Sequence, residues 1–319
     1  MEVSSRARGF AMVLVASVLW GVSGTVAQSL LQHHSFTTEW LVTVRLLLSG
    51  GLLLALSLCG KNRSHVWLIV RPGKGLGRLL LFGILGLLGV QYTYFASIEA
   101  GNAATATLLQ YLGPVFLTAY LVVRHRQLPS KAQTLAIVLA LVGTFLLITN
   151  GRPDQLSIAP GAVLWGLASA LALAFYTLYP QSLLQRWGST VVLGWAMLIG
   201  GIGLCILTRP WQTVAIDWQP TSLLGVAFLV LFGTLIAFYL YVDSLRFIRP
   251  AETSLLASAE PLSAVVATVV WLHVPFGLCE WLGALCIIGT VFALAKKEEA
   301  KGQAAAKETA KEAVIEQQM

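Results

Sequence analysis

The chain has 319 residues, of which 57% are hydrophobic and only 11% are charged, and its formal net charge is +7. Soluble globular proteins carry about 25% charged residues, so this composition, with a mean hydropathy of +0.77, excludes a soluble globular domain and indicates a polytopic membrane protein. The basic residues are spread over several short loops without interleaved aromatic residues, which argues against nucleic-acid binding.

Apolar runs of roughly 20 residues recur along almost the whole chain, and each is long enough to cross a hydrocarbon layer of ~30 Å. The N-terminal run exceeds the about 7–15 apolar residues of a cleavable signal peptide, so we expect it to be retained as the first helix. The sequence predicts an all-α membrane protein with ten transmembrane helices, in chain order 10–31, 37–59, 76–97, 102–123, 132–149, 159–180, 190–208, 221–244, 250–272 and 277–295.

The basic residues predict the orientation of these helices, because Lys and Arg concentrate in cytoplasmic loops. The outer segments hold only Arg152 and Arg209 if the N-terminus is inside. The inner segments then hold Arg6, Arg8, Lys61, Arg63, Arg71, Lys74, Arg78, Arg124, Arg126, Lys131, Arg186, Arg246, Arg249 and the C-terminal lysines. We therefore expect both termini to lie in the cytoplasm and the protein to reside in the inner or plasma membrane.

The two halves of the chain repeat one pattern. YTYFAS at 92–97 lies 147 positions before YLYVDS at 239–244, and the same offset brings Pro114 onto Pro261. Five spans per half is an odd number, so the second copy must insert inverted relative to the first. We expect one repeat over 1–149 and another over 150–295. A mixed-charge tail follows over 296–319, either a solvated cytoplasmic segment or a partner-binding one.

These features resemble the drug/metabolite transporter superfamily, specifically its ten-helix branch with two EamA-type domains. The resemblance covers about residues 10–295 and rests on YTYFASIEAGNAATATLLQYLGPVFLTAYLVV, its counterpart YLYVDSLRFIRPAETSLLASAEPLSAVVATVV, VLWG in the first span and WLVTVRLLLSGG in the second. Arg45 stands where the family's second helix commonly has an arginine. The Gly-Glu pair that often follows the fourth and ninth helices is replaced by RHRQLP and LHVPFG.

The resemblance implies a secondary transporter that exports amino acids or related small organic metabolites. Its mechanism would be alternating access around a cavity at the membrane midplane. A flippase for lipid-linked substrates, which the same superfamily includes, is the alternative, and it would need a lateral opening between helices.

Two prolines occupy matching places in the two halves. Pro114 lies inside the predicted fourth helix and Pro261 inside the ninth, where a proline cannot donate to the carbonyl four residues earlier, here those of Gln110 and Ala257. Each helix should kink there. A freed carbonyl in hydrocarbon needs a partner or a wet cavity, so the paired breaks predict a central binding site. A kink that only serves helix packing is the alternative.

Polar residues lie at helical spacing from these prolines. In the first half they are Thr107, Gln110 and Tyr111, and their counterparts in the second half include Ser254 and Ser258. Such a face could bind a solute, but small and hydroxyl residues also favour close helix packing in membranes. The pattern alone leaves both interpretations open.

Glu260 is the acidic residue that the predicted ninth helix carries near its middle. It lies about 12 residues from the outer end, which at ~1.5 Å per residue places it about 18 Å deep. A charge at this depth costs about 2.5–3.5 kcal/mol, so the carboxyl should face the bundle interior. It could couple transport to protons or hold a cationic substrate; a neutral carboxyl bonded to a neighbouring helix is the alternative.

Arg45 and several aromatic residues complete the candidate site. Arg45 could pair with Glu260 or bind an anionic group of a substrate, or it could snorkel outward or pair with Glu39. An aromatic wall would suit an amphipathic metabolite, although Tyr and Trp near span ends are usually interfacial. The aromatic residues in or near the first, third, sixth and eighth spans are Trp20, Tyr92, Tyr94, Phe175, Tyr176, Phe238, Tyr239 and Tyr241. Trp20 and Tyr176 are the deepest of these, and we select Trp20, Tyr92, Tyr176 and Tyr239 as candidates for the cavity wall.

An intramembrane enzyme is the rival from another class. Gly21–Val22–Ser23–Gly24 has the Gly-x-Ser-Gly form of a membrane serine protease, but that chemistry needs a base. The five histidines, His33, His34, His65, His125 and His273, all fall in loops or at span ends. No HExxH motif or phosphate-binding loop is present in the sequence, so we expect no metal, no cofactor and no direct ATP drive.

Overall fold

The computed structural model describes residues 2–59, 63–71, 73–126, 128–152, 156–212, 216, 218–248 and 250–294. Arg249 and the predicted tail over 296–319 lie outside these residues. Every regular element within them is helical: α1 (Glu2–His33), α2 (Thr38–Cys59), α3 (Arg63–Leu68), α4 (Lys74–Leu81), η1 (Phe82–Leu88), α5 (Gly89–Ala100), α6 (Ala103–Gln110), α7 (Gly113–His125), α8 (Lys131–Thr149), α9 (Pro160–Leu178), α10 (Gln181–Trp187), α11 (Ser189–Thr208), α12 (Pro220–Val230), η2 (Leu231–Ile236), α13 (Ala237–Ser244), α14 (Pro250–Leu256) and α15 (Ala259–Trp271).

Eight helical stretches in the described residues are long and apolar enough to cross a membrane: Arg6–His33, Thr38–Cys59, Gly75–Ala100, Ala103–Arg124, Lys131–Thr149, Pro160–Leu178, Ser189–Thr208 and Pro220–Ser244. Two shorter apolar helices, Ala259–Trp271 and Leu278–Leu294, follow them. Each of the ten predicted spans coincides with helical structure, and the prediction of an all-α membrane protein is confirmed for this part of the chain. The predicted ninth helix is divided, because α14 ends before α15 begins.

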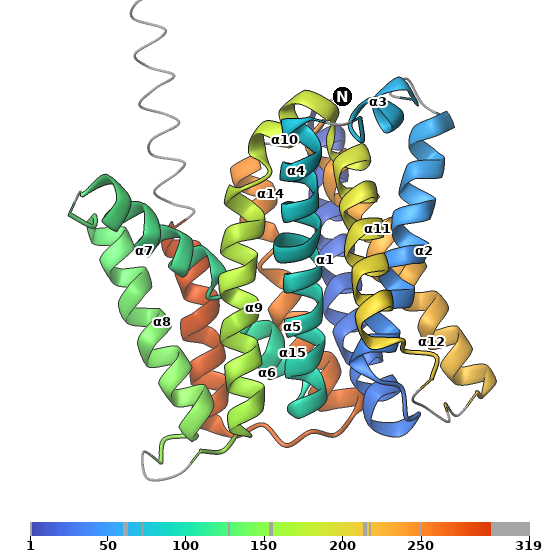
Figure 1. The fold of residues 1–319 in the computed structure, drawn as a ribbon. Helices are drawn as coiled ribbons and strands as arrows, with labels where there is room; N and C mark the ends of the chain where they lie inside the picture. Colours follow the sequence, from blue (N-terminus) through green and yellow to red (C-terminus); the bar gives the residue numbers. More distant parts are fainter. Residues whose placement is uncertain are drawn as a thin grey trace, which may run out of the picture.

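Figure 1 shows the helices as an upright bundle. The chain enters at the upper end, where α4, α10 and α14 also lie, and α6 lies in the lower half. The pair formed by α7 and α8 stands at the left, beside the final helix and away from α2 and α12. The first described residues and the end of the final helix both lie toward the upper end.

Irregular segments recur at matching places in the two halves. The π-helical segment η1 interrupts the third apolar stretch and η2 interrupts the eighth, and the offset of 147 residues carries η1 onto 229–235, almost onto η2. The breaks also correspond, because α6 ends at Gln110 and α14 ends at Leu256. Short π-helical insertions frequently accompany functional sites, since they widen a turn and redirect its side chains.

Two glycines of α1 allow the close packing that surrounds these irregular segments. A Cβ atom on Gly21 would lie 2.6 Å from the carbonyl oxygen of Glu260, and one on Gly24 would lie 2.5 Å from the hydroxyl of Tyr94. Only glycine leaves room for both contacts. The Gly-x-Ser-Gly motif therefore brings α1 against α15 and α5.

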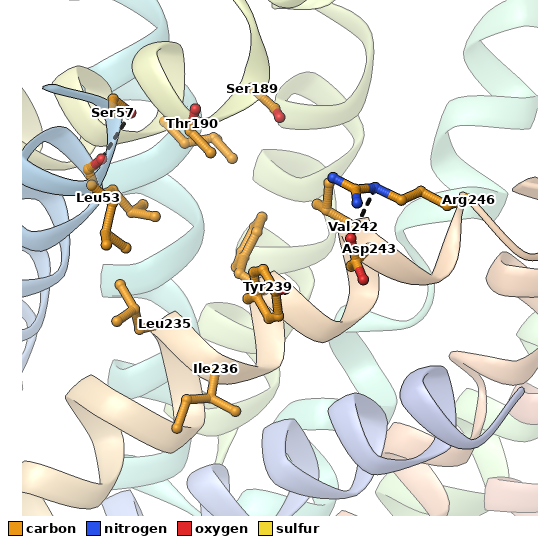
Figure 2. Close-up of a pocket in the computed structure, with 13 residues that line it drawn as sticks. Leu53, Ser57, Ser189, Thr190, Leu235, Ile236, Tyr239, Val242, Asp243 and Arg246 are labelled. Carbon is orange, nitrogen blue, oxygen red and sulfur yellow. Dashed lines mark hydrogen bonds and ion pairs between the residues drawn. The ribbon is translucent and has the colours of Figure 1, made fainter. Parts of the chain in front are cut away.

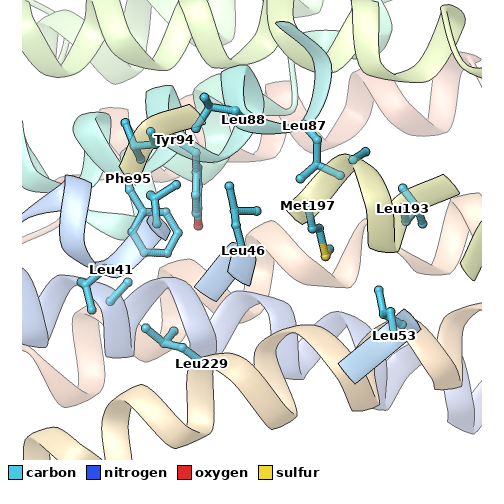
Figure 3. Close-up of a cluster of buried hydrophobic side chains, with 14 of the residues drawn as sticks. Leu41, Leu46, Leu53, Leu87, Leu88, Tyr94, Phe95, Leu193, Met197 and Leu229 are labelled. Carbon is cyan, nitrogen blue, oxygen red and sulfur yellow. The ribbon is translucent and has the colours of Figure 1, made fainter. Parts of the chain in front are cut away.

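A large apolar cluster supports the helices on one side of the bundle. Figure 3 shows Leu41, Leu46, Phe95 and Met197 among its members, where α2, α5 and α11 meet. Leu41, Leu46 and Phe95 are almost completely buried. Between helices in a membrane such contacts stabilise by close packing rather than by exclusion of water. Arg45 precedes Leu46 in the sequence, so this tightly packed cluster lies next to Arg45.

Candidate functional site

Two adjoining cavities lie at the breaks. The central cavity has a volume of about 190 Å³, and the wide cavity beside it has a volume of about 580 Å³. Six residues line both: Trp20, Gln110, Leu173, Tyr176, Phe238 and Glu260. The combined space is in the range that small-molecule sites occupy in proteins.

Glu260 reaches both cavities from the first turn of α15. Its Oε2 atom lies 2.9 Å from the hydroxyl of Tyr111, and the same hydroxyl lies 2.8 Å from the carbonyl oxygen of Ala257. That carbonyl is the one that Pro261 frees, and it also accepts from the backbone N–H of Glu260 at 3.0 Å. Tyr111 lies at the break between α6 and α7. Its hydroxyl therefore donates across to the Ala257 carbonyl at the break between α14 and α15.

Arg45 enters the central cavity from α2 and is buried. Its Nε donates to Thr234 Oγ1 at 2.9 Å and its Nη2 donates to the carbonyl oxygen of Gly233 at 3.0 Å. The guanidinium also lies over the ring of Phe95, 5.3 Å from its centroid. The alternative in which Arg45 snorkels or pairs with Glu39 is wrong, because the apolar cluster and η2 hold the side chain inside the bundle.

The π-helical turn of η2 explains how Arg45 is held. Thr234 donates its hydroxyl hydrogen to the carbonyl of Leu229, five residues earlier, at 2.9 Å. Thr234 Oγ1 can therefore accept from Arg45 while donating along its own helix. Arg45 and Glu260 line the same cavity, yet within the described residues neither forms an ion pair.

Several other predicted residues line one or both cavities. Trp20 lines both cavities and packs edge-on against Phe238, with ring centroids 5.7 Å apart. Gln110 donates to Ser169 Oγ at 2.6 Å. Gln110 and Tyr176 each line both cavities. Pro114 lines the wide cavity, whereas Pro261 is buried at the start of α15.

Two predicted hydroxyl residues support the site from behind. Thr107 is completely buried, and its hydroxyl lies 2.8 Å from that of Tyr94. Ser258 donates to the carbonyl of Leu255 at 2.6 Å, which closes the last turn before the break. Neither lines the cavities, so their predicted role as cavity residues is corrected to a packing role. Ser254 belongs to α14, and its side chain falls outside the described part of the structure.

Two predicted tyrosines point elsewhere. Tyr92 donates to Glu39 Oε1 at 3.0 Å and packs against Trp165. Tyr239 is 66% exposed and lines a separate groove on the outside of the bundle. Their predicted placement in the cavity wall is wrong, because successive helical residues are turned by about 100° and both tyrosines fall on the opposite face.

The tyrosines that do line the cavities lie two positions further along each helix, and they were not selected as site residues from the sequence. Tyr94 lines the central cavity and Tyr241 the wide one. Gln91 and Phe238, which precede them by three residues, line the central cavity too. The offset of 147 residues pairs Tyr94 with Tyr241 and Gln91 with Phe238. Applying the repeat together with a helical face would have found all four.

Side-chain hydrogen bonds link α1 and α2 to α5 and α6 at one end of the bundle. Gln28 Oε1 accepts from the backbone N–H of Ala103 at 2.8 Å, and Gln32 Nε2 donates to the carbonyl of Gly101 at 2.9 Å. Thr38 donates to Glu99 Oε2 at 2.7 Å nearby. The wide cavity lies toward the other end, where its lining includes Leu294.

The comparisons with known proteins decide the family. Residues 7–149 and 160–295, which make up most of the chain, match the sequence model of the "EamA-like transporter family". The chain belongs to the EamA-like transporter family. The predicted resemblance is thus confirmed, and this EamA-like transporter is a multi-pass membrane protein with two EamA repeats.

Relatives of this EamA-like transporter extend over nearly the whole chain. The Salmonella typhimurium protein "Uncharacterized inner membrane transporter YicL" is 36% identical over 305 residues, which cover 95% of this chain and 100% of that protein. The Bacillus subtilis protein "Uncharacterized transporter YwfM" is 26% identical over 300 residues, or 92% and 96% of the two chains. A solved crystal structure has a similar fold, with a TM-score of 0.60 at 20% identity, and covers 93% of this chain and 99% of that one.

Proposed function

We propose that this EamA-like transporter is a secondary transporter that exports amino acids or related small organic metabolites by alternating access. It crosses the inner or plasma membrane ten times, as two inverted five-helix halves that meet near residue 150, with both termini in the cytoplasm. The Salmonella relative is named as an inner membrane transporter, which supports this location. The observation that carries the proposal is the cavity at the two helix breaks, into which Arg45 and Glu260 both project.

The asymmetry of the cavities supports an inward-facing conformation. The end whose helices are linked by Gln28, Gln32 and Thr38 is the one that the distribution of basic residues predicts to be outside. The wide cavity lies on the side of the predicted cytoplasm, where a substrate for export would enter. Transport would require the bonds that Gln28, Gln32 and Thr38 make to break while the wide cavity collapses.

The two ionisable side chains suit opposite ends of an amino acid. Nη1 of Arg45 and Oε1 of Glu260 make no hydrogen bond within the described residues, so each is free to contact a ligand. The carboxylate of a substrate would meet Arg45 and its ammonium would meet Glu260, with the side chain among the aromatic residues of the wide cavity. Each charge-assisted contact contributes about 1.5–3 kcal/mol, or about 10- to 150-fold in affinity.

Competition for Glu260 supplies a route to proton coupling. The hydroxyl of Tyr111 has one hydrogen and faces two acceptors, Glu260 Oε2 and the Ala257 carbonyl. An ionised Glu260 accepts that hydrogen, whereas a protonated Glu260 donates to Tyr111, which then donates to Ala257. A proton and a substrate ammonium would therefore exclude each other at one carboxyl. The other titratable groups around these cavities are Arg45, Tyr94, Tyr176 and Tyr241.

A flippase for lipid-linked substrates receives less support. A flippase would need an opening from the central cavity into the bilayer. The groove on the outside of the bundle that contains Tyr239 is separated from the central cavity by Phe238, which lines both the groove and the cavity. The ring of Trp20 packs against Phe238 from within. Along this groove, the path to the central cavity is thus blocked by the rings of Phe238 and Trp20.

The proposed function can be tested with the protein reconstituted into proteoliposomes. The uptake of each member of a panel of radiolabelled amino acids is measured with and without a pH gradient. Competition by the matching methyl ester and N-acetyl derivatives tests the two ends separately. We expect wild type to prefer the zwitterion, and Arg45→Gln to bind acid and ester equally, a loss of about 10- to 150-fold in discrimination. Failure of every amino acid and related metabolite in the panel to move would contradict the proposal.

A further inference from the structure

A groove on the outside of the bundle is separate from the candidate site. It has a volume of about 530 Å³ and runs between α2, α11, η2 and α13. Tyr239 and Leu56, which are 66% and 59% exposed, flank it, and Leu53 and Leu193 form its buried floor. The groove therefore opens toward the surroundings of the bundle, which for a transmembrane segment are lipid.

The lining of the groove changes from polar to apolar along its length. Figure 2 shows Arg246, Ser189 and Thr190 along one edge, with Leu235 and Ile236 toward the other. The polar residues come from helix ends, because Ser189 is the first residue of α11 and Arg246 follows the end of α13. All these ends lie on the side that the basic residues place in the cytoplasm. The groove thus has the polarity of a phospholipid, with the headgroup at the membrane boundary.

The polar edge offers donors to a phosphate. The side chain of Arg246 is 77% exposed, and its Nε donates to Asp243 Oδ1 at 2.9 Å. Its two Nη groups and the hydroxyls of Ser189 and Thr190 make no hydrogen bond within the described residues. Guanidinium groups bind phosphate oxygens through paired N–H donors. Asp243 competes for the same guanidinium and sets a limit on the affinity.

We propose that this groove binds a membrane phospholipid, with its phosphate at Arg246 and one acyl chain along Leu53, Leu193 and Leu235. The acyl chain then lies against the outer face of Phe238, whose inner face lines the central cavity. A bound lipid supports that wall, so the lipid and the transport site share one side chain. This inference does not depend on which solute is transported.

Native mass spectrometry of the purified full chain, with dioleoyl phosphatidylglycerol or dioleoylglycerol as probe, tests the proposal. We expect retention of the phospholipid and at least tenfold less retention of the diacylglycerol, which lacks the phosphate. Arg246→Gln should reduce phospholipid retention by about tenfold, since a charge-assisted contact contributes about 1.5–3 kcal/mol. Asp243→Asn should raise retention, because it frees the guanidinium.

Two matched controls locate the site. Arg186→Gln removes another basic residue on the predicted cytoplasmic side and should leave retention unchanged. Val242→Trp fills the groove and should abolish retention, whereas Leu52→Trp, at an equally exposed residue on α2 outside the groove, should not. Equal retention of both probes, or equal retention by Arg246→Gln and wild type, would overturn the headgroup assignment. Equal effects of the two tryptophan variants would overturn the groove.

Discussion

Tyr111→Phe removes one hydroxyl from the contact between the two broken helices. That hydroxyl lies 2.8 Å from the Ala257 carbonyl and 2.9 Å from Glu260 Oε2. Only one of these bonds can use its hydrogen at a time, and Ala257 keeps the backbone N–H of Glu260 at 3.0 Å. With Glu260 ionised, the loss of stability is therefore that of one interhelical hydrogen bond in a membrane, about 0.6–1.7 kcal/mol.

The functional loss should be larger than the loss of stability. Without the Tyr111 hydroxyl, a change in the protonation of Glu260 no longer alters the hydrogen bond to the Ala257 carbonyl. We therefore expect gradient-driven uptake in proteoliposomes to fall at least tenfold while substrate exchange persists. Tyr176→Phe is the matched control, since Tyr176 lines both cavities and its hydroxyl makes no hydrogen bond within the described residues. It should remain within twofold of wild type.

A double-mutant cycle makes the test quantitative. Tyr111→Phe and Glu260→Gln should be coupled in unfolding free energy, measured by detergent-induced unfolding, because the two side chains contact each other. Additive effects of the two substitutions, or equal uptake by Tyr111→Phe and Tyr176→Phe, would refute the role given to the hydroxyl.

Two further substitutions test the geometry of the site. Tyr94→Phe removes the hydrogen bond between Tyr94 and Thr107 at the cavity wall and should lower the free energy of unfolding by about 0.5–1.5 kcal/mol, the contribution of a neutral hydrogen bond; a variant as stable as wild type would show that this bond does not support the wall. Gly21→Val places a side chain 2.6 Å from the Glu260 carbonyl and should lower the unfolding midpoint and abolish uptake. Gly51→Val, which meets open space, should change neither, and a tolerated Gly21→Val would contradict the close packing of α1 on α15.

The positions of the helices could be predicted from the sequence because long apolar runs have few alternatives in a membrane. Apolar length and charge sorting gave spans whose ends differ from the observed helices by a few residues, apart from α1, which begins at Glu2. The internal repeat also predicted paired breaks at Pro114 and Pro261. The π-helical turns were not predicted, because they depend on packing rather than on any residue type.

The site was only partly predictable, because composition does not say which face of a helix points inward. Tyr92 and Tyr239 were chosen, yet Tyr94 and Tyr241 line the cavities. The error is the same in both halves, as expected for a repeat. Arg45 shows the other limit: its partners, Thr234 and the Gly233 carbonyl, lie far along the chain on a π-helical turn.

Glu260→Gln in proteoliposomes is the most direct measurement of the central claim, that one carboxyl at the helix breaks serves both substrate and proton. With an amino acid that wild type accumulates, the variant should lose accumulation driven by a pH gradient. It should still exchange internal for external substrate, but with an apparent affinity about 10- to 150-fold weaker, because the amide no longer holds the substrate ammonium by a charge-assisted contact. Gradient-driven accumulation equal to that of wild type would contradict the account.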